Sequence, residues 1–281
     1  MQFTLQFDGA LADRNALNFY DASRAIAGFQ RTLALVTHLA LNGEIIVQAP
    51  ALKGADIIVH PPEEGSWKIA ATIIGGVFAV GAVGKDSPIG HVVTSVYDYV
   101  LYETMGFHVD YDRTLQSLYN EKAITEEKLD SLIEKAEPSI VEMHRPIVAS
   151  KTALSGFTYS GPEGLPTQRG PEFSLMSFNY MMEEVRADRP EYFLGIVSSY
   201  NVNTFKGRIY VIAEKRTIPF ELAKERRDRA SVRLITDSLR TNADGQNYEQ
   251  AALHFEGWRY TSKGGRLKRI VVTEVAGRDT F

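Results

Sequence analysis

The sequence contains no cysteine. Without thiols the protein can form no disulfide, use no thiolate nucleophile and bind no zinc or iron–sulfur cluster through sulfur. The motifs G-x-S-x-G, H-E-x-x-H and G-x-G-x-x-G are also missing. Hydrolases with a nucleophile elbow, zinc metalloproteases and dinucleotide-binding enzymes therefore lack their usual sequence signatures. We interpret the protein as non-enzymatic and predict no catalytic residue, no metal and no cofactor.

Long hydrophobic runs are also missing. Residues 69–83 form an apolar run of 15 residues, shorter than the ~20 that a membrane-spanning helix needs. We interpret residues 69–105 as a strand followed by buried helices. The alternative is a membrane-perturbing hairpin in which glycines allow close backbone contact. The stretch MQFTLQFDGALADRN at the start carries acidic residues and no long apolar run, unlike a signal peptide, so we expect a cytoplasmic protein.

Charge is distributed unevenly along the chain. The formal net charge is −4, but residues 1–192 hold 15 Lys and Arg against 25 Asp and Glu, whereas residues 193–281 hold 16 against 10. Two parts of opposite sign attract each other, within one chain or between neighbouring chains. We therefore expect a homo-oligomer or a complex with a partner protein.

The first 154 residues predict an α+β domain. Residues 3–7 alternate apolar and polar side chains, as a strand does. Residues 15–42 carry apolar side chains at helical spacing, and Asn42-Gly43 is a typical helix stop. Three short runs rich in β-branched residues follow, at 44–49, 55–62 and 65–74. The predicted unit is therefore β-α-β-β-β, with an apolar helical extension up to residue 154.

The C-terminal part predicts a small barrel. Residues 155–172 are dense in Gly and Pro, and we predict that they form a linker. In residues 173–281, strand patterns surround one helix in the order β-β-β-α-β-β. This order resembles the OB-fold, a five-stranded barrel. The predicted fold class is thus α+β, with an N-terminal β-α-β-β-β unit and an OB-like C-terminal barrel.

Two polar groups in the N-terminal part invite a chemical interpretation. His108, Asp110 and Asp112 stand at alternate positions and would share one face of a strand, as in a hard-metal or phosphoesterase site. No second cluster supplies further ligands, so a metal-dependent phosphoesterase stays an alternative. Glu142 and His144 stand two residues apart with Arg145 beside them, which would suit a general base with an anion clamp or simply an ion-paired segment.

Cations and aromatic residues gather where OB-like barrels bind their ligands, over strands two and three and in the bordering loops. Positive side chains neutralise phosphates, and aromatic rings stack with bases. This combination favours single-stranded nucleic acid or a nucleotide, with docking of a partner protein as the alternative. The candidate ligand-binding residues are Tyr200, Phe205, Lys206, Arg208, Trp258, Tyr260, Lys263 and Arg266.

Several segments together resemble a known group of bacterial proteins. These are FQRTLALVTHLALNGE, EIIVQAP and ADIIVHPPEEGSWKI, and the barrel pattern NTFKGRIYV…IPFEL…GRLKRIVVTEV. The combination resembles proteins catalogued only as domains of unknown function, some of them near mobile elements or anti-phage defence genes. The resemblance implies an intracellular binding or assembly component of a bacterial defence system. It brings no catalytic residues to this chain.

Overall fold

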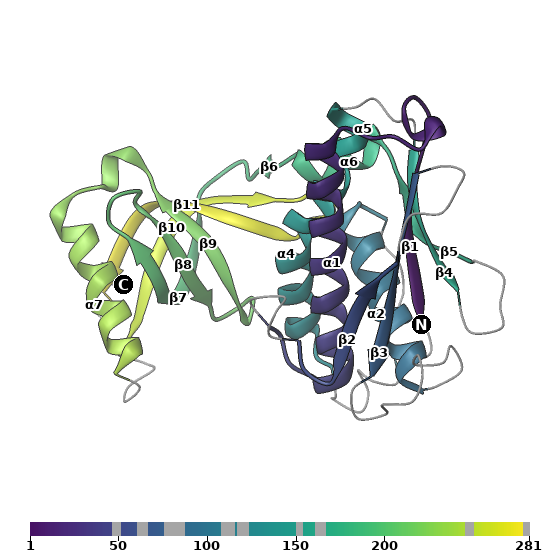
Figure 1. Ribbon diagram of the computed structural model, residues 1–281. Helices are drawn as coiled ribbons and strands as arrows, with labels where there is room; N and C mark the ends of the chain where they lie inside the picture. Colours follow the sequence, from purple (N-terminus) through teal and green to yellow (C-terminus); the bar gives the residue numbers. More distant parts are fainter. Residues whose placement is uncertain are drawn as a thin grey trace. The chain divides into compact units, whose positions relative to one another are not determined.

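The computed structural model describes residues 1–46, 52–60, 67–75, 88–107, 116, 124–149, 154–160, 167–244 and 250–277. The chain divides into two compact units, Met1–Met182 (unit 1) and Glu183–Phe281 (unit 2). Each unit has a hydrophobic core of its own. The predicted α+β class with a C-terminal barrel is confirmed (Figure 1).

Unit 1 contains a five-stranded antiparallel sheet in the order β2-β3-β1-β4-β5. In the central strand β1, alternate residues Phe3, Leu5 and Phe7 are fully buried, and the residues between them face the other side of the sheet. This alternation gives the sheet one core face and one polar face. The strands are β1 (Gln2–Asp8), β2 (Ala55–Val59), β3 (Trp67–Gly75), β4 (Leu154–Ser160) and β5 (Thr167–Phe173).

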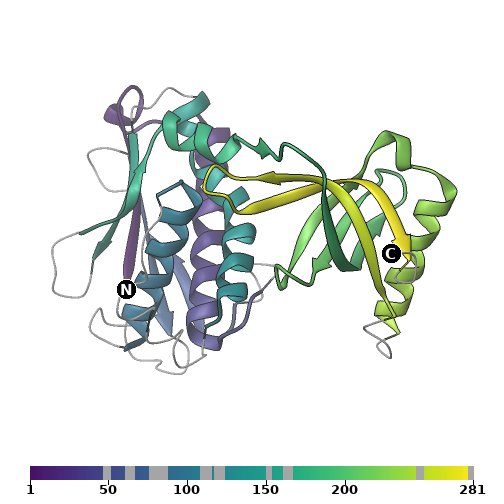
Figure 2. The ribbon, with the colours of Figure 1, turned by 180° about the vertical axis from the view of Figure 1, so that it is seen from behind.

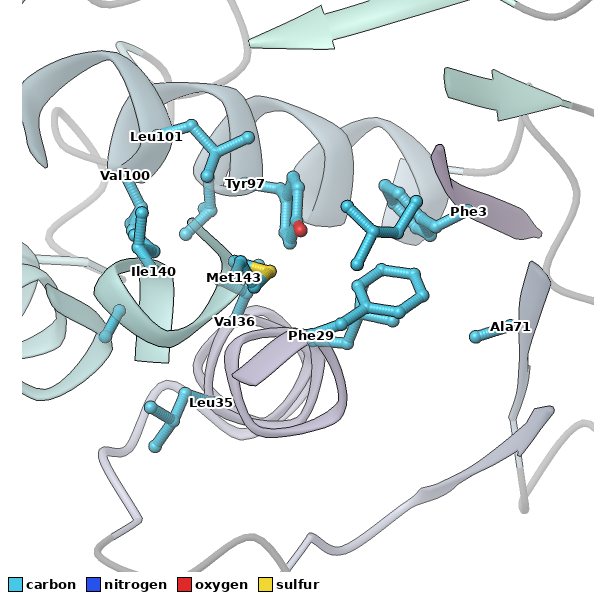
Figure 3. Close-up of a cluster of buried hydrophobic side chains, with 14 of the residues drawn as sticks. Phe3, Phe29, Leu35, Val36, Ala71, Tyr97, Val100, Leu101, Ile140 and Met143 are labelled. Atoms are coloured by element: carbon cyan, nitrogen blue, oxygen red, sulfur yellow. The ribbon is translucent and has the colours of Figure 1, made fainter. Parts of the chain in front are cut away.

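Helices cover the core face of this sheet (Figure 1). The long helix α1 begins at the Asn18 cap, whose side chain accepts hydrogen bonds from two backbone amides, and it ends at Gly43 in the left-handed conformation. Figure 3 shows Phe29 of α1, Tyr97 of α2 and Phe3 of β1 in the core, with Met143 of α4 beside Tyr97 and Val36. The helices are α1 (Phe19–Asn42), α2 (Pro88–Thr104), α4 (Glu126–Met143), α5 (Arg145–Ala149) and α6 (Leu175–Met182), with a short 3-10 turn at Ala12–Arg14.

Unit 2 is a closed five-stranded barrel. Its strands pair in the circular order β7-β8-β9-β11-β10-β7, and only the β9–β11 pairing is parallel. Helix α7 connects the third barrel strand to the fourth, as in the OB-fold, and strands β10 and β11 run side by side (Figure 2). The elements are β6 (Val185–Arg186), β7 (Glu191–Asn201), β8 (Lys206–Val211), β9 (Arg216–Leu222), a 3-10 turn (Lys224–Arg226), α7 (Arg229–Ala243), β10 (Ala252–Thr261) and β11 (Leu267–Gly277).

The linker prediction was wrong. Residues 155–172 contribute to β4 and β5, and β4 pairs with the central strand β1. The boundary between the units falls after Met182 instead. The strand predicted at 44–49 is not formed at residues 44–46, and its remaining residues lie outside the described part of the chain. The strands predicted at 55–62 and 65–74 are confirmed as β2 and β3.

The described parts of residues 69–105 belong to the core of unit 1. Strand β3 pairs with β1, and α2 buries Val96, Tyr97, Val100 and Leu101. Among the helices of the described residues, none has both the length and the apolar character required to cross a bilayer.

Candidate ligand-binding face of the barrel

The outer surface of the barrel carries a row of charged side chains around one aromatic ring. Ile209 and Val211 of β8 and Ile218, Phe220 and Leu222 of β9 are buried and face inward. Lys206 and Glu221, which oppose each other in register, therefore lie on the outside. On the neighbouring strands, Tyr260 of β10 is paired with both Arg269 of β11 and Arg186 of β6. We call Lys206, Glu221, Arg269, Tyr260 and Arg186 the charged row.

Ion pairs connect the members of the charged row. The Nζ of Lys206 lies 3.6 Å from Glu221 Oε2, and Nη1 of Arg269 lies 3.2 Å from the other oxygen of the same carboxylate. Arg269 also donates to Glu184 at 2.9 Å. Partial burial lowers the pKa of Arg269, but the hydrogen bond to Glu184 and the charges of Glu184 and Glu221 together raise it above its ordinary value. Arg269 therefore stays charged.

The two aromatic side chains predicted on β10 are covered by arginines. The guanidinium carbon of Arg269 lies 3.9 Å from the ring centroid of Tyr260, and that of Arg186 lies 4.5 Å from the ring centroid of Trp258. These are cation–π contacts, which occupy one face of each ring. The groups that these pairs present to a ligand are therefore planar guanidiniums, which bind phosphates in a bidentate manner and also stack with bases.

Two predicted ligand-binding residues take part in packing instead. Tyr200 stacks on Phe220 of the barrel core, with ring centroids 6.0 Å apart and an interplanar angle of 6°. Burial of its hydroxyl raises the pKa of Tyr200, while the charge of Arg227 opposes the shift. Phe205 has a left-handed backbone (φ 56°), packs against the same core and has Arg227 over its ring. The structure does not bring these two rings to the charged row.

The remaining predicted cations lie on β8 and in the loop between β10 and β11. Arg208 donates to the carbonyl of Thr217 at 3.2 Å on the neighbouring strand. Lys263 forms an ion pair with Glu183 at 2.5 Å. Arg266 lies in the turn that Gly265 makes with its left-handed backbone. Lys263 and Arg266 therefore lie in the loop that leads directly into β11.

Sequence reasoning missed five residues at this face. Arg269 had a detectable signal, because strand alternation places it on the same side of β11 as Val271, which is opposite Trp258. Residues Glu183–Arg186, which we call the covering segment, contact Lys263, Arg269 and Trp258. This segment gave no comparable signal, because its strand has only two residues and is too short for an alternating pattern. The missed residues are Glu183, Glu184, Arg186, Glu221 and Arg269.

No metal or general-base site emerges in the described part of the chain. His108, Asp110 and Asp112 lie outside the described residues, and elsewhere in that part no group of three His, Asp or Glu side chains could hold a metal ion. The Glu142, His144 and Arg145 group is divided. Glu142 pairs with Arg24, Arg145 pairs with Asp21, and His144 is buried against Phe173.

The two units correspond to two described families. Residues 3–156 match the family described as "Domain of unknown function (DUF7946)". Residues 189–276, which span the five barrel strands, match "Family of unknown function (DUF7947)". No curated protein and no solved structure matches the chain. The comparisons therefore name families but no activity.

Proposed function

Because the chain belongs to the DUF7946 family, whose description names no activity, we propose a function from the barrel itself: unit 2 is a non-enzymatic module that binds the phosphate backbone of single-stranded nucleic acid. The observation that carries this proposal is the charged row. It places Lys206, Arg269 and Arg186 across the outer surface of an OB-ordered barrel, beside the loop that holds Lys263 and Arg266.

The extent of the charged row favours a strand over a single nucleotide. From β8 to β6 the row crosses β9, β11 and β10, so it covers four spacings between neighbouring strands. At about 4.8 Å for each spacing, the row is about 19 Å long when it is measured around the curved surface of the barrel. A ligand with several phosphates can contact cations along this length, whereas a single nucleotide reaches only a part of it.

The acidic partners of these cations favour a second candidate, a docking surface for a partner protein. Glu183, Glu184 and Glu221 neutralise much of the charge on this face. A protein partner with alternating charges would fit such a surface, with the ion pairs setting its register. The two candidates differ in their response to an oligonucleotide.

The test is fluorescence anisotropy of the full chain with a labelled oligothymidylate of about 12 nucleotides, within the site size of an OB-fold. The logarithm of the binding constant should fall linearly with the logarithm of the salt concentration, by about 0.7 for each phosphate neutralised. The double variant Lys206→Ala/Lys263→Ala should lower the slope by about 1.4.

The matched control is Arg233→Ala/Arg240→Ala. It removes the same charge from unit 2, but from the exposed side of α7. This control should leave the slope unchanged. Absence of binding at low ionic strength would reject the nucleic-acid function and favour the protein-docking candidate.

A further inference from the structure

This inference rests on the proposed nucleic-acid function and concerns its regulation. We infer that the covering segment, Glu183–Arg186, is an internal competitor whose two carboxylates occupy the positions of ligand phosphates on the barrel. A polyanion would then bind by displacing these two carboxylates from Lys263 and Arg269, so the intact chain binds more weakly than a chain without them.

The position of the covering segment supports this inference. Its strand β6 pairs with β10 through only two residues, Val185 opposite Thr261 and Arg186 opposite Tyr260. The next residue, Ala187, donates a backbone hydrogen bond to Arg259 at 2.9 Å. The segment therefore lies along the part of β10 that carries Tyr260, within the proposed binding face.

The carboxylates of the covering segment contact cations that a ligand would need. Glu183 lies 2.5 Å from Lys263 in the loop between β10 and β11, and Glu184 lies 2.9 Å from Arg269 in the charged row. A carboxylate and a phosphodiester each present two anionic oxygens, and arginine binds either pair by charge-assisted hydrogen bonds. A phosphate can therefore replace each carboxylate without a new type of contact.

The covering segment is also weakly held. All four of its residues are exposed. The side chains of Lys263 and Glu183 are 45% and 50% exposed, and an ion pair at this exposure contributes little to stability. The side chains of Arg269 and Glu184 are 32% and 28% exposed. Exchange of these carboxylates for phosphates therefore requires no unfolding of the barrel, whose five strands close without β6.

The test compares two charge-matched variants of the full chain with the same oligothymidylate at low ionic strength. Glu183→Gln/Glu184→Gln should tighten binding by roughly 2- to 30-fold, the range expected when two exposed ion pairs no longer compete. The control, Glu225→Gln/Asp244→Asn, removes two exposed acids elsewhere in unit 2 and should tighten binding much less.

The outcomes separate the inference from the function on which it rests. Absence of binding by all three proteins rejects the proposed function. Binding with equal affinity for the parent and Glu183→Gln/Glu184→Gln, or equal tightening by both variants, overturns the inference and leaves the function standing.

Discussion

The Nε2 atom of His144 lies 2.9 Å from the hydroxyl oxygen of Ser177, and the Nδ1 atom lies 2.8 Å from the carbonyl oxygen of Ile140. The imidazole is fully buried and stacks on Phe173 with an interplanar angle of 1°. Burial lowers its pKa from 6.5 to about 4, while the hydrogen bond to Ile140 opposes the shift. His144 is thus a neutral side chain that joins α4 to α6.

This burial predicts a pH-dependent stability of unit 1. The unfolded state binds a proton near pH 6.5, and the folded state binds it only near pH 4. Stability is therefore fully present above pH 6.5 and decreases as the pH falls toward 4, by roughly 3 kcal/mol in total. We expect urea unfolding to show that the free energy of unfolding falls more steeply between pH 6.5 and 4 in the parent than in His144→Gln.

His60 provides the control for this measurement. Its imidazole is exposed and contacts Thr72 at 2.7 Å. The variant His60→Gln should keep the pH dependence of the parent. If His144→Gln keeps it as well, the acid sensitivity arises from other groups.

The contact between α1 and α4 predicts a steric requirement for glycine at position 28. A Cβ atom on Gly28 would lie 2.3 Å from the carbonyl oxygen of Ser139, so one of the two backbones would have to move. Gly28→Ala should therefore destabilise the protein by about 1–3 kcal/mol. A Cβ atom added at Gly156 would have no other atom within 4 Å. Gly156→Ala should therefore change stability by no more than about 0.5 kcal/mol. Chemical denaturation of both variants measures the difference.

The packing of Tyr200 predicts that its ring and its hydroxyl have opposite effects on stability. The hydroxyl is buried and has no hydrogen-bond partner among the residues that the structure describes. Tyr200→Phe should therefore leave stability unchanged or raise it by about 1 kcal/mol. Tyr200→Ala removes the ring that stacks on Phe220 and should lower stability by about 2 kcal/mol. Neither variant should change the salt dependence of oligonucleotide binding. A change would indicate that Tyr200 belongs to the binding face.

The N-terminal cap of α7 predicts a side-chain preference at position 228. Asp228 accepts hydrogen bonds from the backbone amides of Ala230 and Ser231 at 2.8 and 3.0 Å. Asp228→Ala leaves both amides without this acceptor and should lower the midpoint of thermal unfolding. Asp228→Ser keeps a capping oxygen and should lower it less. Equal losses for the two variants would show that the capping oxygen is not the source of the effect.

Self-association stays a prediction from the charge distribution. Sedimentation velocity at low and high salt, at micromolar concentration, would measure it. Oligomers that dissociate as salt increases would agree with contacts between the oppositely charged parts. A monomer under both conditions would contradict the prediction.

The barrel could be predicted from the sequence because its information is local. Strand β9 alternates between buried and partly exposed residues along its whole length, and the helix lies between the third and fourth strands. Strands β4 and β5 could not be predicted in this way, because their glycine and proline residues are more typical of a linker than of a strand. Gly170 has a positive φ of 67° and a Cβ there would lie 2.5 Å from Leu101, so tertiary packing requires this glycine within a strand.

The candidate binding face could be located from the sequence, but its ion pairs could not. Glu184 and Arg269 are separated by 85 residues, and no local pattern connects them. The half-buried positions of Tyr200 and Phe205 also depend on how the barrel closes around Phe220. The residue types therefore predicted a basic and aromatic binding face. Which of these side chains lie on that face depends on the tertiary structure.

The place of β1 between β3 and β4 has a consequence for synthesis on the ribosome. Strand β1 can pair with β3 once residue 75 has been made, but its second edge has no partner until β4 ends at residue 160. At about 5–20 residues per second, this interval of translation lasts about 4–17 s. During that time the central strand of unit 1 offers an open edge flanked by Phe3, Leu5 and Phe7, which a chaperone or a second nascent chain can reach.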